Sequence, residues 1–101
     1  MWAQLITMRL KPGKDAELAT LLEALRDTEQ PGSGLIRSTT MRDQSDPLRV
    51  YTLVVFESEA RARERENDAR REAGLASVRA MMAEVMDGPA EFTNLDVVTE
   101  G

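Results

Sequence analysis

Four segments of the chain have the apolar spacing of β-strands. Residues 2–10 alternate loosely, with side chains such as Ile6 and Met8 on one face and Ala3 and Leu5 on the other. This pattern predicts a strand with apolar groups on both faces. The other three predicted strands are residues 35–42, 48–56 and 90–99.

Two further segments have helical periodicity. Residues 15–29 place their leucines on one stripe, and Pro31 with the glycines after it ends this predicted helix. Residues 59–86 follow Ser58, a residue type that caps helices, and carry two apolar stripes on nearly opposite sides. One stripe contains Leu75, Val78, Met82 and Val85, and the other contains Ala62, Ala69, Ala73 and Ala76. Since a straight helix would bury only one of them, we expect a break near Gly74.

The order of these elements predicts an α+β fold of the ferredoxin-like type, β-α-β-β-α-β, with both helical regions on one face of an antiparallel sheet. The third strand is apolar on both faces, with Val54 and Phe56 on one and Leu53 and Val55 on the other. Strands of this kind are covered on both sides. A second copy of the chain is the simplest cover, so we predict a homodimer in which sheet faces sheet.

Composition limits the chemistry. The 101 residues suit one domain spanning 1–101, and they include no histidine and no cysteine. Thiolate catalysis, thiolate metal sites and the usual haem ligand are therefore absent, and no carboxylate cluster indicates a metal site. The net charge of −5 argues against nucleic-acid or anionic-membrane partners. Without a leader-like N-terminus or a long apolar run, we expect a cytoplasmic protein.

Several short motifs, in this order, resemble those of a known family. They are "KPGK" after the first strand, "PGSGL" before the second, "VVFESEARAR" at the third strand and the next helix, and "DGPAEF" before the fourth. The chain is similar to the antibiotic-biosynthesis-monooxygenase-like (ABM) domains of the dimeric α/β-barrel superfamily. The resemblance implies a dimeric α/β barrel with a pocket between sheet and helices, and either cofactor-independent oxygenation of a small hydrophobic or aromatic compound or no catalysis.

The chain departs from the family pattern at several positions. Phe56 stands where such domains usually have Trp, and Val54 where they often have Glu. Haem-degrading members use Asn, Trp and His where this chain has Ile6, Phe56 and no histidine. These departures argue against haem, and we expect no cofactor.

Strand alternation under this resemblance predicts the walls of the pocket. The expected substrate-binding residues are Gln4, Ile6, Thr52, Phe56, Met81, Met82 and Val85. None of them is a strong base, so the catalytic residue is unknown. Several of them also have a structural explanation: the methionines are typical core filler, and Phe56 buries well as the last residue of a strand. Asn94 and Asp96, which interrupt the last strand with polar groups, could line the pocket but suit an exposed strand face better. A non-catalytic ligand-binding or stress-responsive protein therefore remains the alternative.

Overall fold

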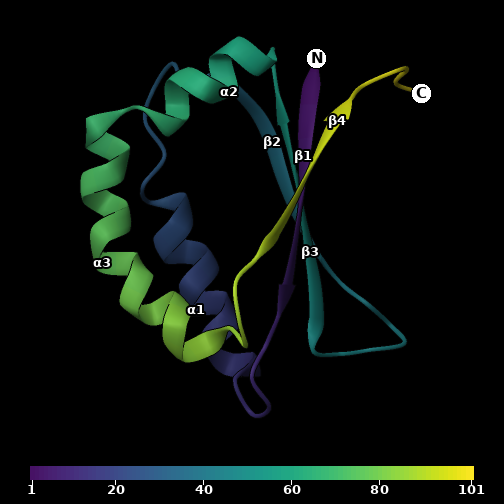
Figure 1. The fold of residues 1–101 in the computed structure, drawn as a ribbon, viewed down its shortest axis with the longest axis vertical. Coiled ribbons are helices and arrows are strands. Elements are labelled where there is room, and N and C mark those ends of the chain that lie inside the picture. Colours follow the sequence, from purple (N-terminus) through teal and green to yellow (C-terminus); the bar gives the residue numbers. More distant parts are fainter.

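Four antiparallel strands form one sheet, and three helices cover one of its faces (Figure 1). The computed structural model describes all 101 residues. The elements are β1 (Trp2–Arg9), α1 (Asp15–Arg26), β2 (Leu35–Arg42), β3 (Arg49–Phe56), α2 (Glu59–Glu66), α3 (Ala69–Val85) and β4 (Glu91–Asp96). The strand order is β2-β3-β1-β4, which confirms the predicted ferredoxin-like arrangement.

The register of β1 and β3 decides which residues face the helices. Trp2 lies opposite Phe56 and Ile6 opposite Thr52, so the even-numbered residues of the two strands share one face. Met8 and Val50 of this set are buried against helical residues, which confirms the predicted alternation.

The buried side chains form two separate clusters under the helices. The lower cluster contains Met8, Leu10, Leu18, Leu21, Val50, Val78, Val85 and Met86. The upper cluster contains Trp2, Val54, Phe56 and Ala62, below α2. Ile6 is half-buried and packs against both clusters, so it marks the junction between them.

The helical region breaks at Asn67 and Asp68, so the predicted break near Gly74 is wrong. Asn67 ends α2, and the carboxylate of Asp68 accepts a hydrogen bond from the Arg70 backbone N–H at the start of α3. Hydrogen bonds from the Arg70 side chain and backbone also lower the pKa of Asp68 to about 2. Ser58 caps α2 as predicted, at 3.2 Å from the Arg61 backbone nitrogen.

Gly74 lies inside α3, where the helix packs closely against the chain that follows α1. A Cβ atom at this position would lie 3.1 Å from Cγ2 of Thr28. The glycine therefore serves close packing rather than a kink. The alanine stripe of α3 is exposed at Ala69, Ala73 and Ala76, and only Ala62 of α2 is buried as expected.

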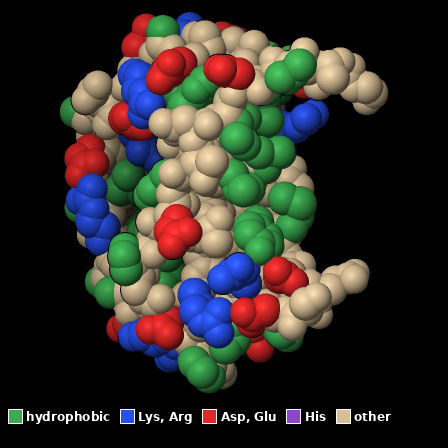
Figure 2. Space-filling model, turned by 45° about the vertical axis from the view of Figure 1, so that its right-hand side comes forward, with side chains coloured by type: hydrophobic (Ala, Val, Ile, Leu, Met, Phe, Trp, Pro, Cys, Tyr) green, Lys and Arg blue, Asp and Glu red, His purple; other side chains and the backbone are tan.

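The other face of the sheet carries no helix. Hydrophobic side chains gather there in a hollowed surface (Figure 2). Val55 is only 2% exposed, while Leu53 is half-buried and Leu95 and Met41 are exposed. The C-terminal segment, residues 97–101, begins beside this face, with the Val97 backbone N–H donating to the Met1 carbonyl at 3.4 Å. None of the helices has the length and apolar character needed to cross a bilayer.

Candidate functional site

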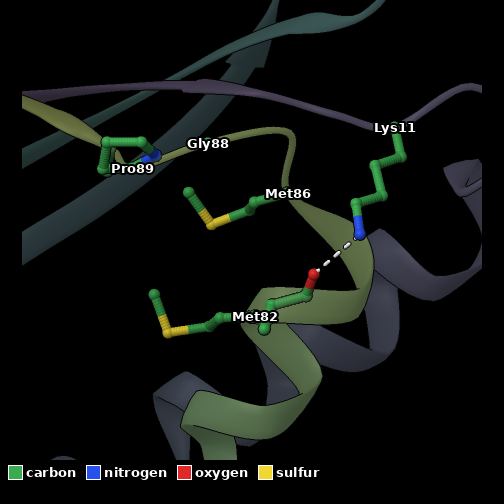
Figure 3. Close-up of a pocket in the computed structure, with 7 residues that line it drawn as sticks. Lys11, Met82, Met86, Gly88 and Pro89 are labelled. Carbon is green, nitrogen blue, oxygen red and sulfur yellow. Dashed lines mark hydrogen bonds between the residues drawn. The ribbon is translucent and has the colours of Figure 1, made fainter.

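A pocket of about 460 Å³ opens where α3 ends and the chain turns towards β4 (Figure 3). We call it the α3 pocket; its lining residues are Lys11, Met82, Ala83, Met86, Gly88, Pro89 and Ala90. Met82 and Met86 extend their thioether side chains from the α3 side, opposite Pro89. The flexible, polarisable thioethers can adapt their shape to an apolar ligand.

Lys11 is the one charged residue in this lining, and its ammonium group already has a partner. Its Nζ donates a hydrogen bond to the Ala83 carbonyl at 3.0 Å. Ala83 belongs to the last turn of α3, which has no basic residue of its own. Lys11 therefore satisfies a carbonyl at the negative end of the helix dipole, and the remaining wall of the pocket is mainly apolar.

A second surface adjoins the pocket along the edge of the sheet. Ile6 lies opposite Phe92, and Gln4 lies opposite Asn94, all on the helix-facing side. We call these four residues the β1–β4 strip. Ala90 of the pocket packs against the lower cluster, and Phe92 follows it by two residues with a side chain that is 61% exposed. The strip thus extends the apolar pocket towards a pair of amides.

The two amides are hydrogen-bonded to each other. Gln4 Nε2 donates to Asn94 Oδ1 at 3.1 Å. The sequence indicated Gln4 for the pocket but favoured an exposed face for Asn94. Asn94 is exposed, yet it lies beside Gln4 because β4 pairs with β1, a strand order that local sequence spacing does not reveal.

The seven residues predicted to bind substrate occupy different places. Met82 lines the α3 pocket, Gln4 and Ile6 belong to the β1–β4 strip, and Met81 is half-buried beside the lower cluster. The other three are core residues: Val85 is 1% exposed, Phe56 is 3% exposed, and Thr52 is buried with its hydroxyl 3.0 Å from that of Thr40. Sequence reasoning missed Lys11 and Phe92, whose positions depend on how the chain runs from the end of α3 to the start of β4.

Titratable groups are few along this side of the sheet. Asp96 is the one carboxylate that the alternation of β4 places on the helix-facing side, opposite Trp2. No three carboxylates come together as a metal site.

Arginines of α2 cover the aromatic pair at the upper end of the sheet. The Trp2 and Phe56 ring centroids are 6.0 Å apart, the Arg63 guanidinium lies 5.2 Å from the Trp2 ring centroid, and that of Arg65 lies 5.3 Å from the Phe56 centroid. These are cation–π distances. Arg63 also forms ion pairs with Glu59 and Glu66. Arg65 donates two hydrogen bonds to Glu29. Both guanidinium groups are therefore already paired with carboxylates.

Replacing Glu29 by Gln is expected to lower the free energy of unfolding by about 1–2 kcal/mol at neutral pH, because Arg65 loses a partly buried, charge-assisted hydrogen-bond partner. Burial raises the pKa of the Glu29 carboxyl, but the hydrogen bonds from Arg65 and Ser33 and the charges of Arg65 and Arg71 together lower it below its usual value of 4.5. The stabilisation is therefore complete above the unfolded-state pKa and is lost as the pH falls through the folded-state pKa. Urea unfolding of both proteins should give a smaller difference at about pH 3 than at pH 7, and an equal difference would contradict the assignment.

Comparison with known proteins gives the family. The sequence profile described as antibiotic biosynthesis monooxygenase (ABM) matches residues 1–77. No curated protein matches the chain.

Solved structures share the fold over nearly the whole chain. A protein of Nitrosomonas europaea, provisionally named an antibiotic biosynthesis monooxygenase, has a TM-score of 0.76 and 14% identity, covering 98% of this chain and 100% of its own. A similarly named protein of Bordetella bronchiseptica has a TM-score of 0.77 and 17% identity, covering 97% of each chain. Rv0793 of Mycobacterium tuberculosis has a TM-score of 0.73 and 17% identity, covering 98% of this chain and 96% of its own. At such identities the likeness shows the fold alone, and the profile match over residues 1–77 shows that the chain belongs to the antibiotic biosynthesis monooxygenase family.

Proposed function

We propose that the protein binds a small hydrophobic or aromatic compound along the α3 pocket and the β1–β4 strip, and oxygenates it without a cofactor. The observation that carries the proposal is an apolar pocket that adjoins two amides on the same side of the sheet. Ligand sites commonly combine apolar walls with a few polar groups that fix orientation. Membership of the ABM family supports the reaction class.

Oxygenation without a cofactor requires a substrate that supplies its own electrons. A methylene group activated by loss of a proton can become a carbonyl group, with one atom of dioxygen entering the product and the other leaving as water. Such a reaction needs an apolar chamber, groups that orient the substrate, and a proton acceptor. Met82, Met86 and Phe92 suit the first task, Gln4 and Asn94 the second, and Asp96 is the carboxylate placed on this face for the third.

A non-catalytic ligand-binding protein is the second candidate, and the titratable groups favour it. The lining of the α3 pocket contains no carboxylate, its lysine bonds to Ala83, and Asp96 is exposed. The two candidates differ in turnover. Incorporation of one labelled atom from ¹⁸O₂ into a bound aromatic compound identifies an oxygenase, whereas binding without incorporation identifies a binding protein.

Replacing Ile6 by Trp is expected to weaken ligand binding strongly while leaving the fold intact, because the larger side chain covers the apolar part of the β1–β4 strip. The neutral fluorescent probe N-phenyl-1-naphthylamine should lose affinity about tenfold or more, with an unchanged melting temperature. A closed core at Ile6 would instead respond to the added volume with a loss of about 1–3 kcal/mol of stability. Ile36→Trp is the matched control, since Ile36 is 48% exposed on β2. Equal probe binding by wild type and Ile6→Trp would overturn the proposed site.

We also propose that two copies pair through the helix-free face of the sheet. Leu5, Leu53 and Leu95 share this face because each lies at an odd-numbered position of its paired strand. The hydrophobic surface in Figure 2 is typical of one that a partner covers. A two-fold axis would bring the same patch of each copy together.

A further inference from the structure

We propose that Gln4 and Asn94 form a specificity site for a neutral ligand that presents a hydrogen-bond donor and acceptor on one edge, such as a primary amide or a lactam. This inference rests on the proposed ligand-binding function and adds the chemical class of the ligand. It assigns Asn94 a role in choosing the ligand.

The geometry of the pair leaves both kinds of hydrogen-bonding group free. The 3.1 Å bond uses one N–H of Gln4 and one lone pair of the Asn94 oxygen. Neither amide has another side-chain hydrogen bond in the structure. An amide carries two N–H donors and one carbonyl acceptor, so Gln4 Oε1 and Asn94 Nδ2 remain available. Since the two residues lie directly opposite each other on adjacent strands, the free acceptor and the free donors belong to two side chains that are bonded to each other.

The neighbouring side chains provide a surface for an apolar ring. Phe92 and Ile6 form the adjacent cross-strand pair on the same face. Phe92 is 61% exposed, so its ring is available to a ligand that reaches the amides. A flat ligand can therefore stack on Phe92 while its polar edge meets the amide pair.

The surrounding charges favour a neutral ligand over an anion. Arg63 lies towards the upper end of this face, over Trp2, and pairs with Glu59 and Glu66. Lys11 lies at the lower end and donates to a helix carbonyl. Asp96, two residues beyond Asn94 on the same face, would repel a ligand carboxylate. A primary amide avoids this repulsion and still offers a donor to Gln4 and an acceptor to Asn94.

Three naphthalene probes test the inference by calorimetry or fluorescence titration. Naphthalene-2-carboxamide has the donor and the acceptor, methyl 2-naphthyl ketone has the acceptor alone, and naphthalene has neither. Wild-type protein should bind the carboxamide about 3- to 10-fold more tightly than naphthalene, the range expected for one or two net hydrogen bonds. The ketone should fall between them.

Asn94→Leu and Gln4→Leu should each bring the ratio of carboxamide affinity to naphthalene affinity close to one. Thr93→Val is the control, because Thr93 lies opposite Leu5 on the other face of the sheet and its variant should keep the preference. Circular dichroism checks that each variant is folded. Because two separate amides are replaced, the test remains decisive if one of the variants does not fold. If wild type binds all three probes equally, or if both leucine variants keep the preference, the specificity site is overturned while the pocket stands. If wild type binds none of the probes, the ligand-binding function and the specificity site both fail.

Discussion

Leu53→Glu is expected to convert the proposed dimer into a monomer at micromolar concentration. Leu53 lies on β3 between Leu5 of β1 and Thr39 of β2, near the middle of the helix-free face. A carboxylate buried in a sheet-to-sheet interface without a partner costs about 3–5 kcal/mol, which raises the dissociation constant more than about 100-fold. Arg37 lines the same surface as Leu53, and its Nη2 atom lies 3.8 Å from Oε1 of Glu100. Its guanidinium group therefore already has a carboxylate partner and would not neutralise the introduced glutamate. Sedimentation velocity over a concentration series measures the effect.

The matched control places the same charge on the helical side of the molecule. Thr20 is exposed on α1, so Thr20→Glu should leave the sedimentation coefficient unchanged. A wild-type protein that sediments as a monomer, or a Leu53→Glu variant that remains dimeric, would rule out this interface.

Phe56→Ala is expected to lower the free energy of unfolding by about 3–5 kcal/mol. The side chain is 3% exposed, packs beside Trp2, and supports the guanidinium of Arg65 on its ring. Truncation therefore removes apolar burial and leaves a cavity in the small upper cluster. The loss is measured as the change in urea midpoint at constant m-value and fixed protein concentration.

Phe92→Ala is the control for this prediction, because it removes the same side chain from a position that is 61% exposed. We expect its unfolding free energy to stay within about 0.5 kcal/mol of wild type. Similar losses of unfolding free energy in the two variants would contradict the prediction that burial in the upper cluster makes Phe56 important for stability.

The sequence predicted the fold well where the spacing of apolar residues repeats. Strand alternation placed Val54 and Phe56 on the helix side, and the leucine stripe placed Leu18 and Leu21 in the core. The predicted position of the helix break was wrong because Asn67 and Asp68 end one helix and begin the next by capping the backbone. The prediction used only the apolar stripes and the glycine.

The candidate site was less predictable because its parts come from distant segments. Alternation assigned Gln4 and Ile6 to the correct face, but it could not separate open surface from closed core. Phe56 and Val85 therefore entered the same predicted set although both are buried. The contact of Asn94 with Gln4 requires β4 to pair with β1, and the contact of Lys11 with Ala83 requires the end of α3 to lie beside Lys11. The neighbouring residues in the sequence indicate neither contact.

The break at Asn67 and Asp68 also has a consequence for local unfolding. Helix α2 is only eight residues long and buries one side chain, Ala62, so detaching it from the sheet exposes little apolar surface of its own. Short helices with so few buried contacts are held mainly by their neighbours. Backbone amides of α2 should therefore exchange with deuterium when this helix alone detaches, whereas those of β1 and β3 should exchange only when the whole protein unfolds. Each opening also exposes the Trp2 and Phe56 rings to solvent, and the loss of their burial adds to its free-energy cost.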